Sequence, residues 1–262
     1  LMFTLPFEES EGNLTSRALR RVGTEVEELE HVFIDTPQEL IVLDPTGGVP
    51  PFFSIIFLHG FDDHSETYED SPAFTPWREQ GLRVVLPRAL QLPITAYQGR
   101  KERSWYDYIT DYDGDLEDTI GEESLSITRR RLQALVDAEA RLLGGHSFVL
   151  LGGFSQGACA AFDTYARHGS RLGGFIGISG HPLSVTPVEP SAQRDAPCSF
   201  YHGTRDRYMP LSWVRPTQER LIDAGWTRVD LAVYQDVEHI PPYEVETAWF
   251  ERFLKPFFQD GA

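Results

Sequence analysis

Short runs of almost continuously apolar residues recur from residue 52 towards the C-terminus. The first, Phe52–Leu58, is typical of a strand that is covered on both faces of a sheet. Similar runs follow at Arg83–Leu86, Phe148–Leu151, Phe175–Ile178, Cys198–Tyr201 and Val229–Tyr234. Helix-like stretches lie between several of these runs, so the pattern predicts a mostly parallel sheet with helices on both faces. We expect one α/β domain.

Two stretches have helical periodicity. The first, Glu122–Leu143, has an apolar face formed by Leu132, Leu135, Val136, Leu142 and Leu143. The second, Pro242–Phe258, is rich in aromatic residues and suits an amphipathic membrane anchor, a helix that binds a partner, or a final helix docked on the sheet. Acidic residues lie between its apolar positions, and they favour the docked helix.

Residues 1–50 have a different character. The first 30 are mainly polar and acidic, and we interpret them as an arm. Two β-rich runs, His31–Asp35 and Glu39–Leu43, are separated by Thr36-Pro37-Gln38, which predicts a β-hairpin that joins the main sheet. We therefore expect an arm and hairpin over 1–50 and the α/β unit over 51–262, within a single domain.

The charge of the chain excludes several classes of function. Among its 262 residues are 40 acids against 23 lysines and arginines, a formal net charge of −17. Such a field repels phosphate backbones, so we expect no nucleic-acid partner. The chain contains no run of about 18 apolar residues, so the sequence predicts no transmembrane segment. The N-terminal residues show no basic stretch followed by an apolar one, so we expect no signal peptide and a cytoplasmic location.

The strongest chemical signal is the segment Gly153-Phe154-Ser155-Gln156-Gly157, which lies between a predicted strand and a predicted helix. A serine on a sharp strand-to-helix turn needs very small neighbours two residues away, which explains both glycines. The turn lifts the hydroxyl above the sheet, where the unpaired amides at the helix start, including that of Gln156, can stabilise an oxyanion. Ser155 is the candidate nucleophile.

A nucleophilic serine needs a histidine base and an acid that orients the base. In this architecture the chain order is serine, acid, histidine, with each residue after a strand. Asp206 follows the run Cys198–Tyr201, and His239 follows Val229–Tyr234. These two residues are the candidate acid and base.

Three further residues are candidates for a role in the site. His59-Gly60-Phe61 follows an early strand, and the amide of Phe61 is a candidate second oxyanion donor, although a simple glycine turn explains the segment as well. His181 also follows a strand and is a candidate for contact with substrate. Within Leu90–Trp105, core packing and substrate contact remain about equally plausible for Trp105.

Together these segments resemble the acyl-protein thioesterases and related carboxylesterases and lysophospholipases of the α/β-hydrolase fold. The motifs that carry the resemblance are Leu58-His59-Gly60 with Asp63, Ser104-Trp105-Tyr106-Asp107, Gly152–Gly157, and His202–Asp206 with Met209-Pro210. Asp62 stands where the family usually has a second glycine. The resemblance implies a triad of Ser155, Asp206 and His239, with the amides of Phe61 and Gln156 as the oxyanion hole.

The resemblance further implies a hydrolase of carboxylic esters or thioesters that uses no cofactor and no catalytic metal. Its substrate is expected to be a small molecule or an acylated partner, with the acyl group near Leu92, Ile94, Trp105 and His181. The acidic segment Asp111–Asp115 lacks the glycine position of a calcium-binding EF-hand loop. A lyase or acyltransferase with the same triad, or a non-catalytic ligand-binding protein, remains the alternative. The oligomeric state is left open, a homodimer included.

Overall fold

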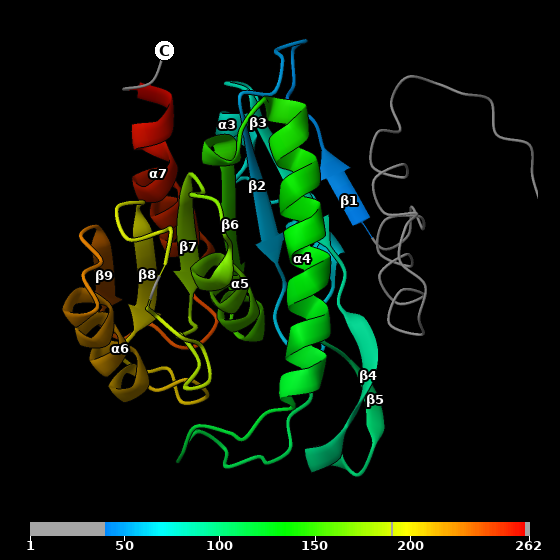
Figure 1. The fold of residues 1–262 in the computed structure, drawn as a ribbon, viewed down its shortest axis with the longest axis vertical. Coiled ribbons are helices and arrows are strands. Elements are labelled where there is room, and N and C mark those ends of the chain that lie inside the picture. Colours follow the sequence, from blue (N-terminus) through cyan, green and yellow to red (C-terminus); the bar gives the residue numbers. More distant parts are fainter. Residues whose placement is uncertain (1–39, 190, 260–262) are drawn as a thin grey trace, which may run out of the picture.

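The computed structural model describes residues 40–189 and 191–259 (Figure 1). The first run of the predicted hairpin and the predicted arm lie outside the described residues. The described part is built on a seven-stranded sheet with strand order β1-β3-β2-β6-β7-β8-β9. Its strands are β1 (Leu40–Leu43), β2 (Phe53–Leu58), β3 (Leu82–Pro87), β6 (Val149–Phe154), β7 (Gly174–Ile178), β8 (Cys198–Gly203) and β9 (Val229–Tyr234).

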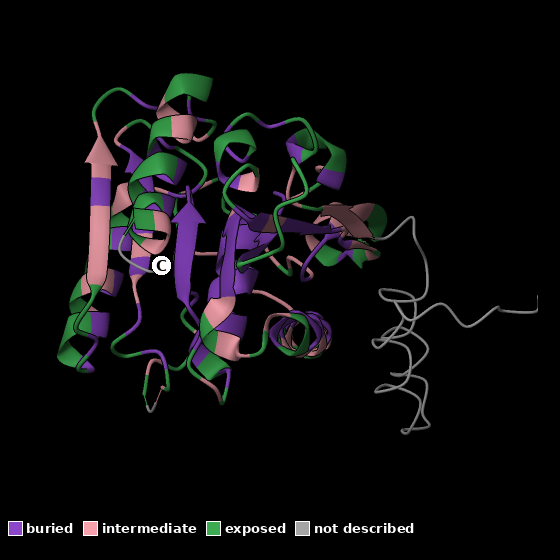
Figure 2. Ribbon diagram, turned by 90° about the horizontal axis from the view of Figure 1, so that it is seen from above, coloured by how far each residue is buried: buried purple, intermediate pink, exposed green. Residues whose placement is uncertain are grey.

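All strand pairs of this sheet are parallel except the pair at one edge, where β1 runs antiparallel to β3. The central strand β2 is buried at every position, and Figure 2 shows the central strands enclosed by the rest of the chain. Full burial on both faces explains why the sequence shows continuous apolar runs here rather than alternation. The mostly parallel sheet predicted from those runs is confirmed.

Five α-helices are described: α3 (Thr75–Arg78), α4 (Glu122–Leu143), α5 (Gln156–Arg167), α6 (Leu211–Asp223) and α7 (Tyr243–Gln259). Three short 3₁₀ helices are η2 (Ser65–Tyr68), η3 (Thr95–Tyr97) and η4 (His146–Phe148). Side chains of α4, α5 and α6 share one core cluster with Ile56 and Leu58 of β2. Those of α3 and α7 share a second cluster with Ile55 and Phe57. Because successive strand residues point to opposite faces, the two clusters lie on the two sides of the sheet.

The two predicted long helices form. The helix α4 has the predicted bounds. Of the five residues predicted to form its apolar face, only Leu142 is largely exposed, at 56%. The helix α7 docks on the sheet as expected, with Trp249 and Phe250 fully buried. No helix among the described residues combines the length and apolar character that crossing a bilayer requires.

The segment after β3 forms a separate hairpin that the apolar runs did not predict. The strands β4 (Leu90–Ile94) and β5 (Arg100–Ser104) pair antiparallel. The turn between them uses left-handed backbone at Gln98 and Gly99, with φ of 59° and 80°. In Figure 1 this hairpin lies below the main sheet, beside the start of α4.

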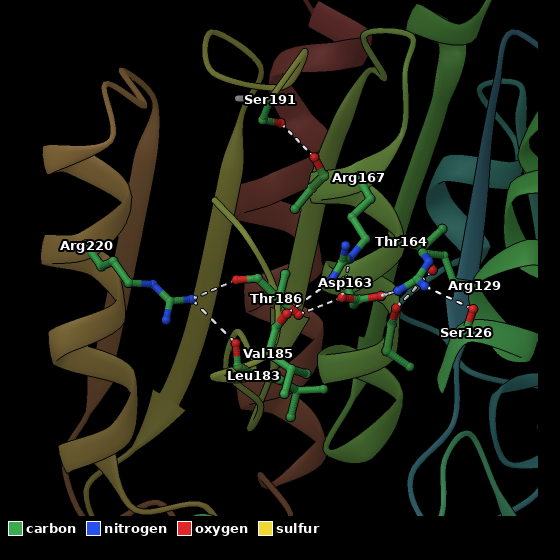
Figure 3. Close-up of polar contacts among 12 residues, drawn as sticks. Ser126, Arg129, Asp163, Thr164, Arg167, Leu183, Val185, Thr186, Ser191 and Arg220 are labelled. Carbon is green, nitrogen blue, oxygen red and sulfur yellow. Dashed lines mark hydrogen bonds and ion pairs between the residues drawn. The ribbon is translucent and has the colours of Figure 1, made fainter. Parts of the chain in front are cut away.

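A buried carboxylate connects two helices and a loop on one side of the sheet. Asp163 of α5 has a fully buried side chain, and it accepts hydrogen bonds from Arg129 of α4 (2.6 Å), Arg167 (2.9 Å) and Thr186 (2.7 Å) (Figure 3). Arg220 of α6 contacts the carbonyl of Thr186 at 3.4 Å from the other side. The cluster therefore connects α4, α5 and the loop that contains Thr186.

Candidate active site

Ser155 lies at the strained turn between β6 and α5. Its backbone has φ 54° and ψ −126°, a conformation that residues with a side chain rarely adopt. A Cβ atom on Gly153 would lie 2.6 Å from the carbonyl carbon of Gly157, and one on Gly157 would lie 2.3 Å from the carbonyl oxygen of His59. Both glycines are therefore required by backbone contacts, as the sequence pattern predicts.

The structure brings the three predicted triad residues together. The Ser155 hydroxyl donates to Nε2 of His239 at 2.9 Å, and Nδ1 of His239 donates to Oδ2 of Asp206 at 2.8 Å. Asp206 lies in the loop after β8 and His239 in the loop after β9. The carboxyl ends of parallel strands meet at one edge of a sheet, which explains how residues far apart in the chain converge.

Backbone amides hold the carboxylate of Asp206 in place. Its Oδ1 accepts the N–H groups of Tyr208 (3.0 Å) and Met209 (2.9 Å), which leaves Oδ2 for His239. His202 donates from Nε2 to the carbonyl of Met209 at 2.6 Å. Burial lowers the pKa of His202, so this ring stays neutral and acts as a support of the loop. The sequence order excluded His202 as the base but did not predict this supporting position.

Three neighbours hold His239 in place. Its ring contacts the rings of Phe154 and Tyr208, with centroid distances of 5.1 and 5.2 Å. The hydroxyl of Ser179 donates to the backbone carbonyl of His239 at 2.7 Å. Ser179 follows β7 and has a left-handed backbone with φ 49°. Sequence reasoning did not identify Ser179, because nothing in its spacing links it to a residue 60 positions away.

The candidate oxyanion donors lie on two sides of the nucleophile. Gln156 is the first residue of α5, where amides have no acceptor within the helix. The Phe61 loop passes close to the nucleophile, since a Cβ on Gly60 would lie 3.6 Å from Cβ of Ser155. Asp62, the residue that replaces a glycine, takes a left-handed φ of 51° and donates its N–H to the carbonyl of Arg103 at 2.9 Å. No described residue accepts a hydrogen bond from the Phe61 N–H.

His59 supports this loop and takes no part in proton transfer. Its Nδ1–H donates to the carbonyl of Gly60 (2.7 Å), and its Nε2 accepts the N–H of Ala89 (3.1 Å). Burial lowers the pKa of His59 to about 4, so the ring remains neutral near pH 7. The carbonyl of His59 in turn accepts the indole N–H of Trp105 at 2.7 Å.

The side chain of Gln156 anchors the segment that contains Trp105. Its Oε1 accepts the backbone N–H of Trp105 (2.9 Å), and its Nε2 donates to the carbonyl of Tyr106 (3.0 Å) and to the hydroxyl of Ser104 (2.8 Å). Trp105 is only 1% exposed. Of the two alternatives left open for this residue, core packing and substrate contact, the structure shows core packing. Trp105 there supports the strand-to-helix turn at Ser155, called the elbow below.

A cavity of about 770 Å³ opens beside Ser155 and His239. His181, the candidate for contact with substrate, lines it. Leu92, Ile94 and Trp105 are not among the described residues that line it. Leu92 and Ile94 lie on β4 of the separate hairpin, and Ile94 is fully buried. Leu92 is half-buried on that strand. Tyr97, which follows β4 within the same segment, does line the cavity. Aromatic residues from other segments complete the wall: Phe61, Tyr108, Phe154, Tyr208 and Trp213.

The cavity wall is also acidic. Seven carboxylates line it, and no lysine or arginine does so among the described residues: Asp63, Asp70, Asp111, Asp113, Glu117, Asp118 and Glu246. Burial raises the pKa of Glu246 to about 7. Four of these acids lie within residues 111–118, and the other three come from segments far away in the sequence. An acidic segment of this kind resembles an ordinary solvated loop, so no local pattern indicated that the seven would share one wall.

His181 and Glu117 close one end of this cavity. Nε2 of His181 lies 3.6 Å from the carboxylate of Glu117, which also accepts the N–H of Ser184 at 2.9 Å. Burial by itself would lower the pKa of His181, but the nearby Cys159 sulfur and the Glu117 carboxylate outweigh burial and raise it to about 10. We therefore expect a charged His181 paired with Glu117 at neutral pH.

Comparisons with known proteins agree with the geometry. A family model described as phospholipase/carboxylesterase matches residues 47–254. Acyl-protein thioesterase 1 of Schizosaccharomyces pombe is 29% identical over 175 residues, which cover 65% of this chain and 75% of that protein. Acyl-protein thioesterase 1 of Yarrowia lipolytica is 25% identical over 219 residues, 77% of this chain and 92% of that protein.

Solved structures show the same fold. Arabidopsis thaliana SOBER1 superposes with a TM-score of 0.67 at 24% identity, over 77% of this chain and 99% of that chain. Zea mays acyl-protein thioesterase 2 superposes with a TM-score of 0.66 at 19% identity, over 82% and 97%. The elbow, the sheet and the family match lead to one conclusion. The chain is a serine ester or thioester hydrolase with the α/β-hydrolase fold, and it belongs to the phospholipase/carboxylesterase family.

Proposed function

We propose that Ser155, His239 and Asp206 transfer an acyl group from an ester or thioester to water through an acyl-enzyme. The observation that carries the proposal is the unbroken line of hydrogen bonds from Ser155 Oγ through His239 to Asp206, at 2.9 and 2.8 Å. The order of donors is set by Asp206, which accepts from Nδ1 and so leaves Nε2 of His239 as the base.

In the first half-reaction His239 takes the Ser155 proton as Oγ attacks the substrate carbonyl carbon. The carbonyl oxygen becomes negative, and the N–H groups of Phe61 and Gln156 stabilise it. The C–O or C–S bond then breaks, and His239 gives its proton to the leaving alcohol or thiol. In the second half-reaction water loses a proton to His239 and attacks the acyl-enzyme, which releases the carboxylic acid and restores the Ser155 hydroxyl.

The cavity wall indicates which substrates this site favours. Seven carboxylates line the cavity and only one of them, Glu117, is paired with the charged His181, so the wall disfavours an anionic group next to the reacting carbonyl. The aromatic residues of the same wall suit an apolar acyl chain, and a cationic group is tolerated there. We therefore expect neutral or cationic esters and thioesters to be hydrolysed with higher kcat/KM than anionic ones of the same acyl length.

An acylated protein is the natural partner that we propose. Several relatives are named acyl-protein thioesterases, in fungi and in Dictyostelium discoideum. Three of the residues that line the cavity are large, hydrophobic and exposed: Tyr208, Ile240 and Tyr243, at 67, 75 and 47%. Such a rim suits a substrate that is larger than the cavity, since part of it stays outside. The cytoplasmic location and the lack of a nucleic-acid partner remain predictions.

The test is steady-state hydrolysis of acyl esters and thioesters of graded chain length, with the acid product measured. We expect turnover by the wild type and a loss of about 10⁵-fold or more in Ser155→Ala. Ser147→Ala is the matched control, because Ser147 is an exposed serine of η4, and it should keep full activity. Equal activity of Ser155→Ala and wild type would refute the proposal.

Product analysis separates hydrolysis from the two other reactions that the same triad can support. A hydrolase releases one carboxylic acid for each alcohol or thiol. An acyltransferase would instead consume a second alcohol or amine in preference to water, and a lyase would cleave a bond without an acyl-enzyme.

The charge preference is tested with three esters of equal acyl length that carry a neutral, a trimethylammonium or a carboxylate group. An anionic ester that is hydrolysed as well as the neutral one would contradict the role assigned to the acidic wall.

A further inference from the structure

Two histidines and one aspartate converge far from the active site. Oδ1 of Asp137 lies 2.8 Å from Nε2 of His146 and 3.5 Å from Nε2 of His168. All three candidate ligand atoms lie within 4.8 Å of one another. We propose that Asp137, His146 and His168 bind a Zn²⁺ ion that fastens the end of α4 to the end of α5.

The backbone at the end of α4 brings His146 back towards Asp137. The helix ends at Gly144, which has a left-handed φ of 83°. The N–H groups of Gly144 and Gly145 both donate to the carbonyl of Ala140, which reverses the chain tightly after the last turn. Asp137 belongs to α4 and His146 begins η4, so the reversal places the two side chains in contact without any flexible segment between them.

His168 is held at the end of α5 with one ring nitrogen directed at the cluster. Its side chain is 6% exposed. Nδ1 lies 3.1 Å from the carbonyl of Ser170 and 3.2 Å from the N–H of the same residue, so it donates to the carbonyl in one tautomer and accepts the N–H in the other. Zinc at Nε2 selects the tautomer in which Nδ1 donates. Gln193 fixes that turn from behind by donating to the carbonyls of His168 (3.2 Å) and Ser170 (2.8 Å). A histidine that donates from Nδ1 to a backbone carbonyl presents Nε2 as a metal ligand, the arrangement common in zinc sites.

The spacing of the ligand atoms suits tetrahedral zinc. Zinc binds nitrogen and carboxylate oxygen at about 2.0–2.2 Å, which places neighbouring ligand atoms about 3.3 Å apart. The separations from Asp137 Oδ1, 2.8 and 3.5 Å, lie on either side of that value. Asp137 and His146 are half-exposed, so their side chains have room to rotate towards an ion, while the buried His168 stays in place.

The chemistry of the donors points to zinc rather than to calcium or magnesium. Two imidazole nitrogens and one carboxylate suit zinc, whereas calcium and magnesium prefer oxygen ligands throughout. Water can take the fourth position, because Asp137 and His146 are exposed to 47 and 34%. The formal net charge of −17 also attracts cations to the surface.

The site is separate from the triad. Ser155 precedes α5 and His168 follows it, and a helix of 12 residues is about 18 Å long. Zinc at this position therefore touches no reacting group. Its effect would be structural, since it would connect α4, η4 and α5 on the side of the sheet opposite α7.

The test is titration of the full chain with ZnCl₂, after removal of any affinity tag and dialysis against a chelator. Calorimetry and competition with a zinc-binding dye should give one ion per chain with a micromolar dissociation constant. MgCl₂ and CaCl₂ should give no such binding. At a free zinc concentration of about 100 times the dissociation constant, we expect Tm to rise by about 5–10 °C.

His146→Gln is the decisive variant. Glutamine can still donate a hydrogen bond to Asp137, but it lacks the ring nitrogen, so we expect zinc affinity to fall by about 100-fold or more and the Tm rise to disappear. His64→Gln is the matched control, because His64 is an exposed histidine outside the cluster, and it should bind zinc as the wild type does. Asp137→Asn should weaken binding as well. No binding by the wild type at 1 mM zinc (on the order of the weakest metal sites), or unchanged binding by His146→Gln, would overturn the proposal.

Discussion

Two buried aspartates, Asp163 and Asp206, show how similar groups acquire different tasks. Both have side chains that are fully inaccessible to solvent. Asp163 contacts two guanidinium groups and the hydroxyl of Thr186. Asp206 contacts two backbone N–H groups and His239. Arginine keeps its proton at any working pH, while histidine exchanges one near neutrality.

The partner therefore decides what each carboxylate can do. Asp163 is neutralised permanently by Arg129 and Arg167, and its position between α4, α5 and the Thr186 loop makes it a structural link (Figure 3). Oδ2 of Asp206 lies 2.8 Å from Nδ1 of His239 and 3.4 Å from Nε2 of His202. Only His239 changes its charge during the proposed reaction, and the amide bonds to Oδ1 fix the direction of Oδ2. We infer that loss of Asp163 lowers stability and loss of Asp206 lowers the rate.

The largest expected effect is that of Asp206→Asn on the rate. The amide keeps the size of the side chain but no longer stabilises the imidazolium, and it can hold His239 in the wrong tautomer. We expect kcat to fall by about 10⁴-fold, measured on the best ester of the panel. Tm should change by only a few degrees. A variant with more than a tenth of wild-type kcat would contradict the role assigned to Asp206.

Asp163→Asn is the matched substitution at the other aspartate. It leaves Arg129 and Arg167 without their buried counter-charge, which should cost about 3–5 kcal/mol of the free energy of unfolding. Denaturant unfolding monitored by circular dichroism measures this loss. At a temperature where the variant is fully folded, kcat should stay within a few-fold of the wild type. A large loss of kcat with unchanged stability would reverse the comparison.

Glu246 supplies a smaller effect that depends on pH. Its pKa in the folded protein is about 7, above the ordinary value of 4.5, so the folded state retains its proton over a range where the unfolded state loses it. Stability should therefore fall as the pH rises from about 4.5 to 7, and the loss should be complete above that range. Glu246→Gln removes this dependence. Because the carboxylate is partly exposed and water screens it, we expect a gain of about 1–2 kcal/mol at pH 8 and little change at pH 4.5.

Measurement of Tm for the wild type and Glu246→Gln across this pH range checks the sign directly. Glu251→Gln is a control on the same helix, since Glu251 is exposed and lies outside the cavity wall. A Glu246→Gln variant that is no more stable than the wild type at pH 8 would contradict the raised pKa assigned to Glu246.

Asp62 is the site of the smallest predicted change. Its left-handed backbone favours glycine, and aspartate tolerates this conformation better than most residues. Asp62→Gly should therefore keep kcat within about threefold. Asp62→Ala should cost about 1 kcal/mol of stability, because alanine is strained in this conformation and makes no local polar contact. Thermal unfolding and kcat of the two variants test whether Asp62 serves the backbone of the oxyanion loop or has another role.

The sheet and its catalytic edge could be predicted because their signals are local. Continuous apolar runs identify buried strands, and the paired glycines around Ser155 identify the elbow. The order of chemistry-bearing residues after successive strands then led to Asp206 and His239. The left-handed backbone at Asp62 also agrees with the sequence, because aspartate tolerates this conformation better than most residues.

Most of the cavity wall, and the place of Trp105 behind it, could not be predicted because the contacts are between distant segments. Trp105 was a candidate for substrate contact, yet its indole N–H bonds the carbonyl of His59, 46 residues away, and its amide bonds the side chain of Gln156, 51 residues away. Neither separation follows from periodicity or motif spacing. The acidic wall combines residues from Asp63 to Glu246 and arises only when the loops are folded together.

The most direct test of the catalytic account is intact-mass labelling with a fluorophosphonate at neutral pH. The reagent reacts only with a serine that a base activates, so it reports on the Ser155–His239–Asp206 arrangement without knowledge of the natural substrate. We expect one adduct on the wild type, on Ser147→Ala and on folded Asp163→Asn, and none on Ser155→Ala. A folded wild-type protein that forms no adduct, or an adduct that persists in Ser155→Ala, would contradict the account.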